Sequence, residues 1–128
     1  MQSPLLNRIA VLVLILWAPV APAHHSFASY DMAKEVTVKG EVKVFVFQNP
    51  HSGIRIAVTD EQGRTVDWLA ETGAPTALAK LGWRRSILKT GDKVTLVVHP
   101  LKDGGNGGSL VRAILADGTV LETGRAEQ

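Results

Sequence analysis

The sequence has 128 residues with 14 basic and 12 acidic side chains, which give a formal net charge of +2. This small imbalance, with no basic run longer than the pair Arg84-Arg85, argues against a nucleic-acid-binding surface. The sequence contains no cysteine, which excludes disulfides, so that packing must hold the fold together.

Residues 1–23 have the three regions of a secretory signal peptide. Arg8 and the initiating amine supply positive charge, an apolar stretch covers residues 9–17, and Ala21-Pro22-Ala23 places small residues at −3 and −1 of a cleavage site. The apolar stretch is shorter than the roughly 20 residues that cross a bilayer, so we expect no permanent membrane anchor. The sequence therefore predicts a periplasmic mature protein that begins at His24.

The predicted mature chain begins with an N-terminal segment, residues 24–34, and continues as a single β-domain, residues 35–123. Residues 36–47 alternate between two faces, which predicts a strand with its valines on one face and with Phe45 and Phe47 on the other. Gly40 interrupts this strand, and a glycine inside a strand often marks a bend.

Further strands and one helix follow in the predicted order. Strands are expected at residues 54–59 and 64–71, around a hairpin turn, and at residues 94–100 and 110–115, with a short sixth strand after Asp117-Gly118. A helix is expected over residues 75–81, because Pro75 suits a helix start and Gly82 suits a helix end.

Three strands, a helix and two strands form the order of an OB-fold, a partly open five-stranded barrel with a helix between its third and fourth strands. The bend at Gly40 agrees with such a barrel, whose corners need bent strands. The sequence thus predicts a mainly β, OB-fold-like barrel. A small β-sandwich with an incidental helical turn is the alternative that the same pattern allows.

All four histidines lie at chain ends or element ends. His24 and His25 begin the predicted mature chain, His51 lies in the turn after the first strand, and His99 closes the fourth strand. In an OB-fold the loops after the first and the fourth strands lie on the binding side of the barrel. We therefore expect His51 and His99 to approach one another, with the N-terminal segment folded over the same rim.

An N-terminal histidine offers a metal ion both its α-amine and its imidazole. The α-amine has a reference pKa of about 7.7–8.0, so a metal displaces its proton readily near neutral pH. Nitrogen-rich sites bind divalent copper more tightly than zinc. The sequence therefore predicts a metal site, with copper favoured, whose ligands come from His24, His51, His99 and His25.

The pairing of amine and imidazole resembles the histidine brace of copper oxygenases and of some copper carriers. Only the first residue of that motif, His24, is matched in this sequence. In a competing arrangement the ligands are the α-amine, the first amide nitrogen and His25.

The histidines are incidental under a second hypothesis, in which the barrel is a non-catalytic binding module for a peptide, an envelope component or a partner protein. Its binding face is expected at Phe45, Phe47, Trp68 and Glu71. No acyl-transfer or phosphate-binding motif is present, so we expect no enzyme; a copper oxygenase is the less favoured third hypothesis.

Six short motifs are distributed over the mature chain. They are Ala23-His24-His25-Ser26-Phe27, Gly40-Glu41-Val42, Asn49-Pro50-His51-Ser52, Trp68-Leu69-Ala70-Glu71, Gly82-Trp83 and Leu88-Lys89-Thr90-Gly91-Asp92. In this combination the chain resembles a family of small exported bacterial proteins, the domain-of-unknown-function family 6152. The resemblance implies a periplasmic setting and supplies no catalytic residues.

Overall fold

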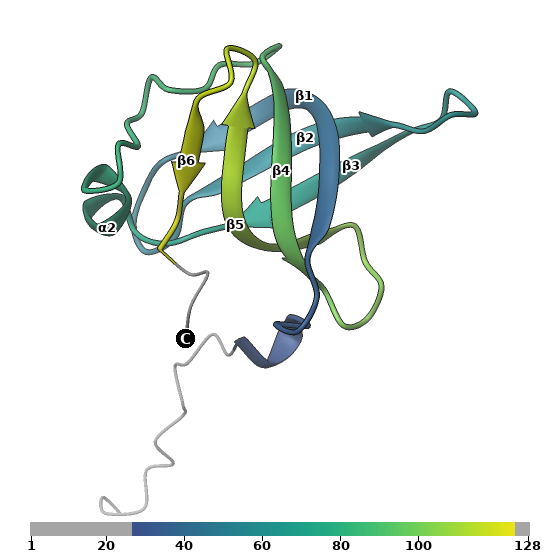
Figure 1. The fold of residues 1–128 in the computed structure, drawn as a ribbon, viewed down its shortest axis with the longest axis horizontal. Helices are drawn as coiled ribbons and strands as arrows, with labels where there is room; N and C mark the ends of the chain where they lie inside the picture. Colours follow the sequence, from purple (N-terminus) through teal and green to yellow (C-terminus); the bar gives the residue numbers. More distant parts are fainter. Residues whose placement is uncertain (1–26, 125–128) are drawn as a thin grey trace, which may run out of the picture.

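The computed structural model describes residues 27–124, so the predicted signal peptide, His24 and His25 lie outside the described residues. Along the described chain the elements are η1 (Phe27–Ser29), β1 (Val36–Val46), β2 (Gly53–Thr59), β3 (Thr65–Glu71), α2 (Pro75–Ala79), β4 (Lys93–Pro100), β5 (Gly107–Leu115) and β6 (Val120–Glu122). Figure 1 shows these elements. Each strand lies within two or three residues of its predicted position.

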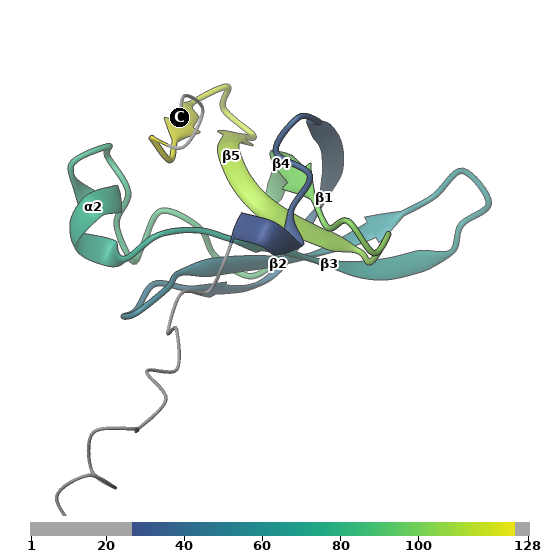
Figure 2. The same ribbon diagram turned by 90° about the horizontal axis from the view of Figure 1, so that it is seen from below.

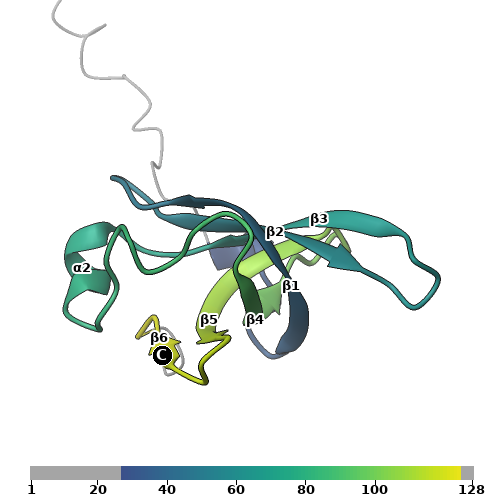
Figure 3. The ribbon, with the colours of Figure 1, turned by 90° about the horizontal axis from the view of Figure 1, so that it is seen from above.

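Five of these strands close into a barrel. The sheet order is β3-β2-β1-β4-β5-β6, and a parallel pairing between β3 and β5 completes the ring. The helix α2 lies between β3 and β4 in the chain, as predicted, and β6 extends the sheet beyond β5. The architecture is therefore the OB-fold-like barrel and not the sandwich. The β2–β3 hairpin extends beyond the barrel (Figures 2 and 3).

Strand β1 serves both halves of the barrel because it changes partner in its middle. Its residues from Val36 to Glu41 pair with β4, and those from Glu41 onward pair with β2. The change of partner falls beside Gly40, where an added Cβ would lie only 2.4 Å from the carbonyl oxygen of Ala57. The predicted bend at Gly40 is confirmed, and the close backbone approach explains why glycine is needed there.

A bulge at Lys43 reverses the two faces of β1. Val42 pairs with Ile56 and Val44 pairs with Arg55, so Lys43 is an extra residue without an opposing partner. A single inserted residue moves every later side chain to the other face. Phe45 and Phe47 therefore pack against the core, while Val44 and Val46 face outward. The predicted single face for the valines is correct up to Val42 and wrong beyond it.

The loop after α2 closes one end of the barrel. The helix ends at Ala79, two residues earlier than predicted, because the chain turns through Gly82 at a φ of +91°. The Trp83 amide then donates to the Leu78 carbonyl at 3.2 Å, and both side chains are buried in the core. The Trp83 indole donates to the carbonyl of Glu122 at 2.8 Å, which ties the loop to β6.

Within residues 27–124, no helix is long and apolar enough to cross a membrane.

Candidate functional site

A groove of about 340 Å³ lies on the outer surface of β1, β2 and β3, next to the loop that joins β1 to β2. The residues that line it are Val44, Val46, His51, Ser52, Gly53, Arg55, Leu69 and Glu71. His51, which is the one exposed histidine among residues 27–124, lines this groove. The strands that form it belong to the face that OB-folds use for ligands.

Two cross-strand rows build the groove. In one row Arg55 lies between Val44 and Leu69, and in the next row Gly53 lies between Val46 and Glu71. Directly paired residues project on the same side of a sheet. Because Gly53 has no side chain, its row has a gap in the middle, and this gap deepens the groove.

Arg55 is the unpaired charge of the groove. Neither a hydrogen bond nor an ion pair joins its guanidinium to any residue between 27 and 124. The nearby acid groups have other partners: Asp67 is 2.9 Å from the ammonium of Lys43, and Glu71 accepts a hydrogen bond from the Tyr30 hydroxyl. The groove therefore presents one free cation beside exposed aliphatic side chains.

The N-terminal segment reaches this groove from the end of β4, which lies on the opposite side of β5 and β3 from the start of β2. The Asp31 amide donates to the Pro100 carbonyl at 2.8 Å, and the Lys102 amide donates to the Ser29 carbonyl at 3.0 Å. These bonds attach the segment to the end of β4, where Figure 1 shows η1. From there the Tyr30 side chain reaches Glu71, at the edge of the groove.

An ion pair within the segment adds to this attachment. The side chain of Lys34 lies 3.1 Å from the Asp31 carboxylate. Its hydrogen bond lowers the pKa of Asp31 below the ordinary value of 3.8. Asp31 is therefore a stable anion at neutral pH, at the point where the segment leaves β4.

His99 has a structural environment that differs from that of His51. Its side chain is only 7% exposed, and its Nδ1 lies 2.8 Å from the carbonyl oxygen of Lys34. His99 pairs with Ser109, which pairs with Glu71, which pairs with Gly53 at the start of β2. Adjacent strands lie about 4.8 Å apart, so about 14 Å of sheet separates His99 from Gly53.

The predicted metal ligands are therefore not gathered by the described chain. His51 and His99 lie at the same end of the barrel, but β3 and β5 come between them. Over residues 27–124 there is no group of three histidine or acidic side chains that could hold a metal ion. His24 and His25, the other two predicted ligands, lie outside the described residues.

The predicted binding face is divided between the inside and the outside of the barrel. Phe45, Phe47 and Trp68 pack against the core, and only Glu71 of the four lines the groove. The sequence did not identify Arg55 and Val44 as groove residues. The exposure of Val44 depends on the bulge at Lys43, for which the alternation of residues 36–47 gives no signal, whereas Arg55 simply alternates with the buried Ile54 and Ile56.

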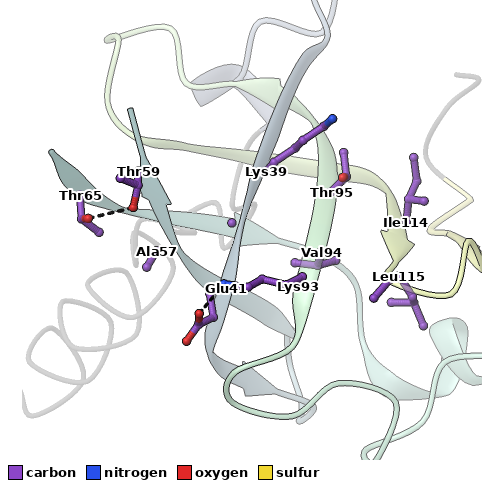
Figure 4. A pocket seen from close by; sticks show the side chains of 12 residues that line it. Lys39, Glu41, Ala57, Thr59, Thr65, Lys93, Val94, Thr95, Ile114 and Leu115 are labelled. Atoms are coloured by element: carbon purple, nitrogen blue, oxygen red, sulfur yellow. Dashed lines mark hydrogen bonds and ion pairs between the residues drawn. The ribbon is translucent and has the colours of Figure 1, made fainter. Parts of the chain in front are cut away.

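A second hollow, of about 690 Å³, lies where β1 bends at Gly40 (Figure 4). Across it Lys93 contacts Glu41 at 2.6 Å, and the hydroxyls of Thr59 and Thr65 are 2.9 Å apart. These groups satisfy one another, and none of the residues predicted to be functional lines this hollow. The groove with His51 is therefore the better candidate site.

Comparison with known protein families identifies one match. The model of the family described as "Family of unknown function (DUF6152)" matches residues 12–111, which confirms the resemblance carried by the sequence motifs. No curated protein and no solved structure matches the chain.

Proposed function

Because this chain belongs to the DUF6152 family, whose function is unknown, its role must be inferred from its own residues: we propose that it is an exported periplasmic protein that binds a metal ion, with copper favoured. The observation that supports this proposal is the hydrogen bond from Tyr30 to Glu71. It attaches the N-terminal segment to the groove that contains His51.

The proposed site requires the terminus to reach His51 from the start of η1. His24 precedes Tyr30 by six residues. Residues 27–29 of this stretch form η1, so only the three residues from His24 to Phe27 are available to extend, over at most about 10 Å. The proposal requires this stretch to lead from Phe27 into the groove, which is lined by His51 and by Glu71, the hydrogen-bond partner of Tyr30.

The proposed ligands are the α-amine and the imidazole of His24 together with the imidazole of His51. Such a set of nitrogen donors favours divalent copper over zinc. His99 is a weaker candidate than its sequence position indicates, because its ring is buried and β5 and β3 separate it from the start of β2. His25 belongs to the competing arrangement with the α-amine and the first amide nitrogen.

We assign the protein to metal carriage or sensing rather than catalysis. A copper oxygenase needs a surface that holds its substrate beside the metal. The groove of about 340 Å³ is at the lower end of the range for small-molecule sites, roughly 300–1,000 Å³, and the metal ligands would occupy part of it.

A blocked terminus tests the proposed site. Protein that begins at His24 is compared with a version that begins Met-His24, which removes the terminal amine from residue 24 but keeps every imidazole. We expect the blocked version, and separately His51→Ala, to bind divalent copper at least tenfold more weakly, about 1.4 kcal/mol. Electron paramagnetic resonance of the native form should show mainly nitrogen coupling.

The matched control is Arg55→Gln, which changes the same groove without removing a proposed ligand. It should alter copper affinity far less than His51→Ala does. Equal copper affinity of the native and blocked forms rules out the amine ligand, and equal affinity of native protein and His51→Ala removes His51 from the site. The intact mass of protein recovered from the periplasm should correspond to residues 24–128, and a mass that includes residues 1–23 contradicts the proposed terminus.

A second candidate function is a binding module that needs no metal. It is favoured by the exposure of Val44, Val46 and Leu69 around the unpaired Arg55. Single exposed aliphatic residues are ordinary, but three around a free cation in a groove are typical of a binding site. Retention of an organic ligand after treatment with a chelator would support this function over the first.

A further inference from the structure

We propose that the groove around Arg55 binds a small amphipathic carboxylate, meaning an acyl chain or an aromatic ring that carries a carboxylate group. This inference rests on the second candidate function, the binding module, and it requires no metal ion. It assigns the carboxylate to Arg55 and the apolar part of the ligand to the hollow at Gly53.

The charge of the ligand follows from the neighbours of Arg55. The guanidinium projects from the middle strand of the groove, between Val44 and Leu69. The two acids closest along the same face are already engaged, Asp67 with Lys43 and Glu71 with Tyr30. An arginine presents a planar fork of N–H donors that matches a carboxylate with two parallel hydrogen bonds. Within residues 27–124 no carboxylate thus occupies the N–H donors of Arg55, which are left to the ligand.

The apolar part of the ligand follows from the walls. Val44, Val46 and Leu69 are 47%, 36% and 39% exposed, although all three are aliphatic. Gly53 lies between Val46 and Glu71 in its row, and because it has no side chain it leaves a hollow at that point. A hydrocarbon group that lies over Gly53 would cover these three side chains while its carboxylate remains at Arg55.

The size and the edges of the groove argue for a small molecule rather than a polypeptide. Its volume of about 340 Å³ suits a ligand of modest size. A bound peptide strand needs an open strand edge, but β2 is paired on both sides, with β1 and with β3. A single arginine also makes a weak site for a polyphosphate, which is usually bound by several cations.

Titration of the protein with octanoate, in the presence of a chelator, tests the inference. Amide signals in two-dimensional NMR report where the probe binds. We expect saturable shifts at residues 44–46, 53–55 and 69–71, and at least tenfold weaker binding of the uncharged octanol. Arg55→Gln should reduce the affinity for octanoate at least tenfold and should leave the affinity for octanol nearly unchanged.

Two further variants separate charge from shape. Gly53→Ala narrows the hollow, and the backbone should accept it, because a Cβ at this position lies 3.5 Å or more from its neighbours. This variant should weaken the binding of both octanoate and octanol. Arg85→Gln removes the same charge from an exposed loop and should change neither affinity.

The outcomes distinguish this inference from the function on which it rests. Equal affinity for octanoate and octanol in the groove would support the binding-module function but would rule out a carboxylate as the group that Arg55 recognises. Octanoate binding that Arg55→Gln leaves intact would also overturn it. If neither probe shifts the amide signals of the groove residues, both the carboxylate ligand and the binding of any small molecule in this groove are rejected.

Discussion

The Nδ1 atom of His99 lies 2.8 Å from the carbonyl oxygen of Lys34, and this contact joins the end of β4 to the residues just before β1. His99 is buried, and its ring contacts the segment that it helps to hold. The same segment carries Tyr30 toward the groove. A histidine that sequence position marks as a metal ligand therefore has a structural role in the described chain.

Replacement of His99 should reveal that structural role. In His99→Leu the Lys34 carbonyl loses its partner, and we expect the free energy of unfolding to fall by about 1 kcal/mol, the usual net value of a hydrogen bond. His99→Asn keeps an N–H close to the position of Nδ1 and should retain most of that stability. Urea denaturation of the two variants measures the difference. Equal stability of both variants would show that the contact with Lys34 contributes nothing.

Removal of the Tyr30 hydroxyl should separate the N-terminal segment from the groove. Tyr30→Phe keeps the ring and loses only the hydrogen bond to Glu71. Because Glu71 is exposed, we expect the free energy of unfolding to fall by less than about 1.5 kcal/mol. Hydrogen exchange at the Asp31 and Lys102 amides should become faster, and copper should bind several-fold more weakly. Unchanged copper affinity would show that the metal site does not depend on this attachment.

Gly40 and Gly53 form a matched pair for testing the backbone packing of β1 and β2. A Cβ at Gly40 would lie 2.4 Å from the Ala57 carbonyl oxygen, whereas one at Gly53 has its nearest neighbour at 3.5 Å. We expect Gly40→Ala to destabilise the barrel by about 1–3 kcal/mol, because the clash is with backbone. Gly53→Ala should change stability by less than about 1 kcal/mol. Thermal unfolding measures both, and equal shifts would contradict the close approach of β1 and β2.

The turn between β2 and β3 should contribute to stability at neutral pH and lose that contribution in acid. The Asp60 carboxylate accepts hydrogen bonds from the Arg64 amide and side chain, and the amide bond is the main cause of a pKa below the ordinary 3.8. A folded-state pKa that is lowered means stability that is present above 3.8 and is lost as the pH falls through the folded value.

Unfolding measured from pH 7 to pH 2 tests this dependence. Asp60→Asn should be less stable than the native protein at pH 7, and the two should converge below pH 3.8. Glu61→Gln removes the same charge from the same turn and serves as the control. A constant difference between Asp60→Asn and the native protein over the whole range would contradict the linkage.

The order of the elements could be predicted because local signals mark each one. Alternation identified the strands, and Pro75 and Gly82 marked the two ends of the helical region. The OB-fold-like barrel then followed from the order of strands and helix. Its closure depends on the parallel pairing of Leu69–Glu71 with Gly107–Ser109, which the general fold implies but no local pattern encodes.

The candidate site was harder to predict, because it depends on contacts between distant residues. The exposure of Val44 depends on an unpaired residue at Lys43, and the alternating pattern on either side of the bulge looks uninterrupted. The link between Tyr30 and Glu71 joins residues 41 positions apart. His51 was identified from its place in a turn, but its distance from His99 is set by the strands that lie between them.

The bulge at Lys43 determines which side chains of the second half of β1 face the core. If Lys43 itself paired with Arg55 and the bulge were lost, every later residue would move by one position, which would turn Phe45 and Phe47 toward water and Val44 and Val46 toward the interior. The core would lose its aromatic contacts, including that of Phe45 with Trp83, and the groove would lose its aliphatic wall at the same time. The pairing register of this one strand therefore sets the composition of both surfaces of the barrel wall.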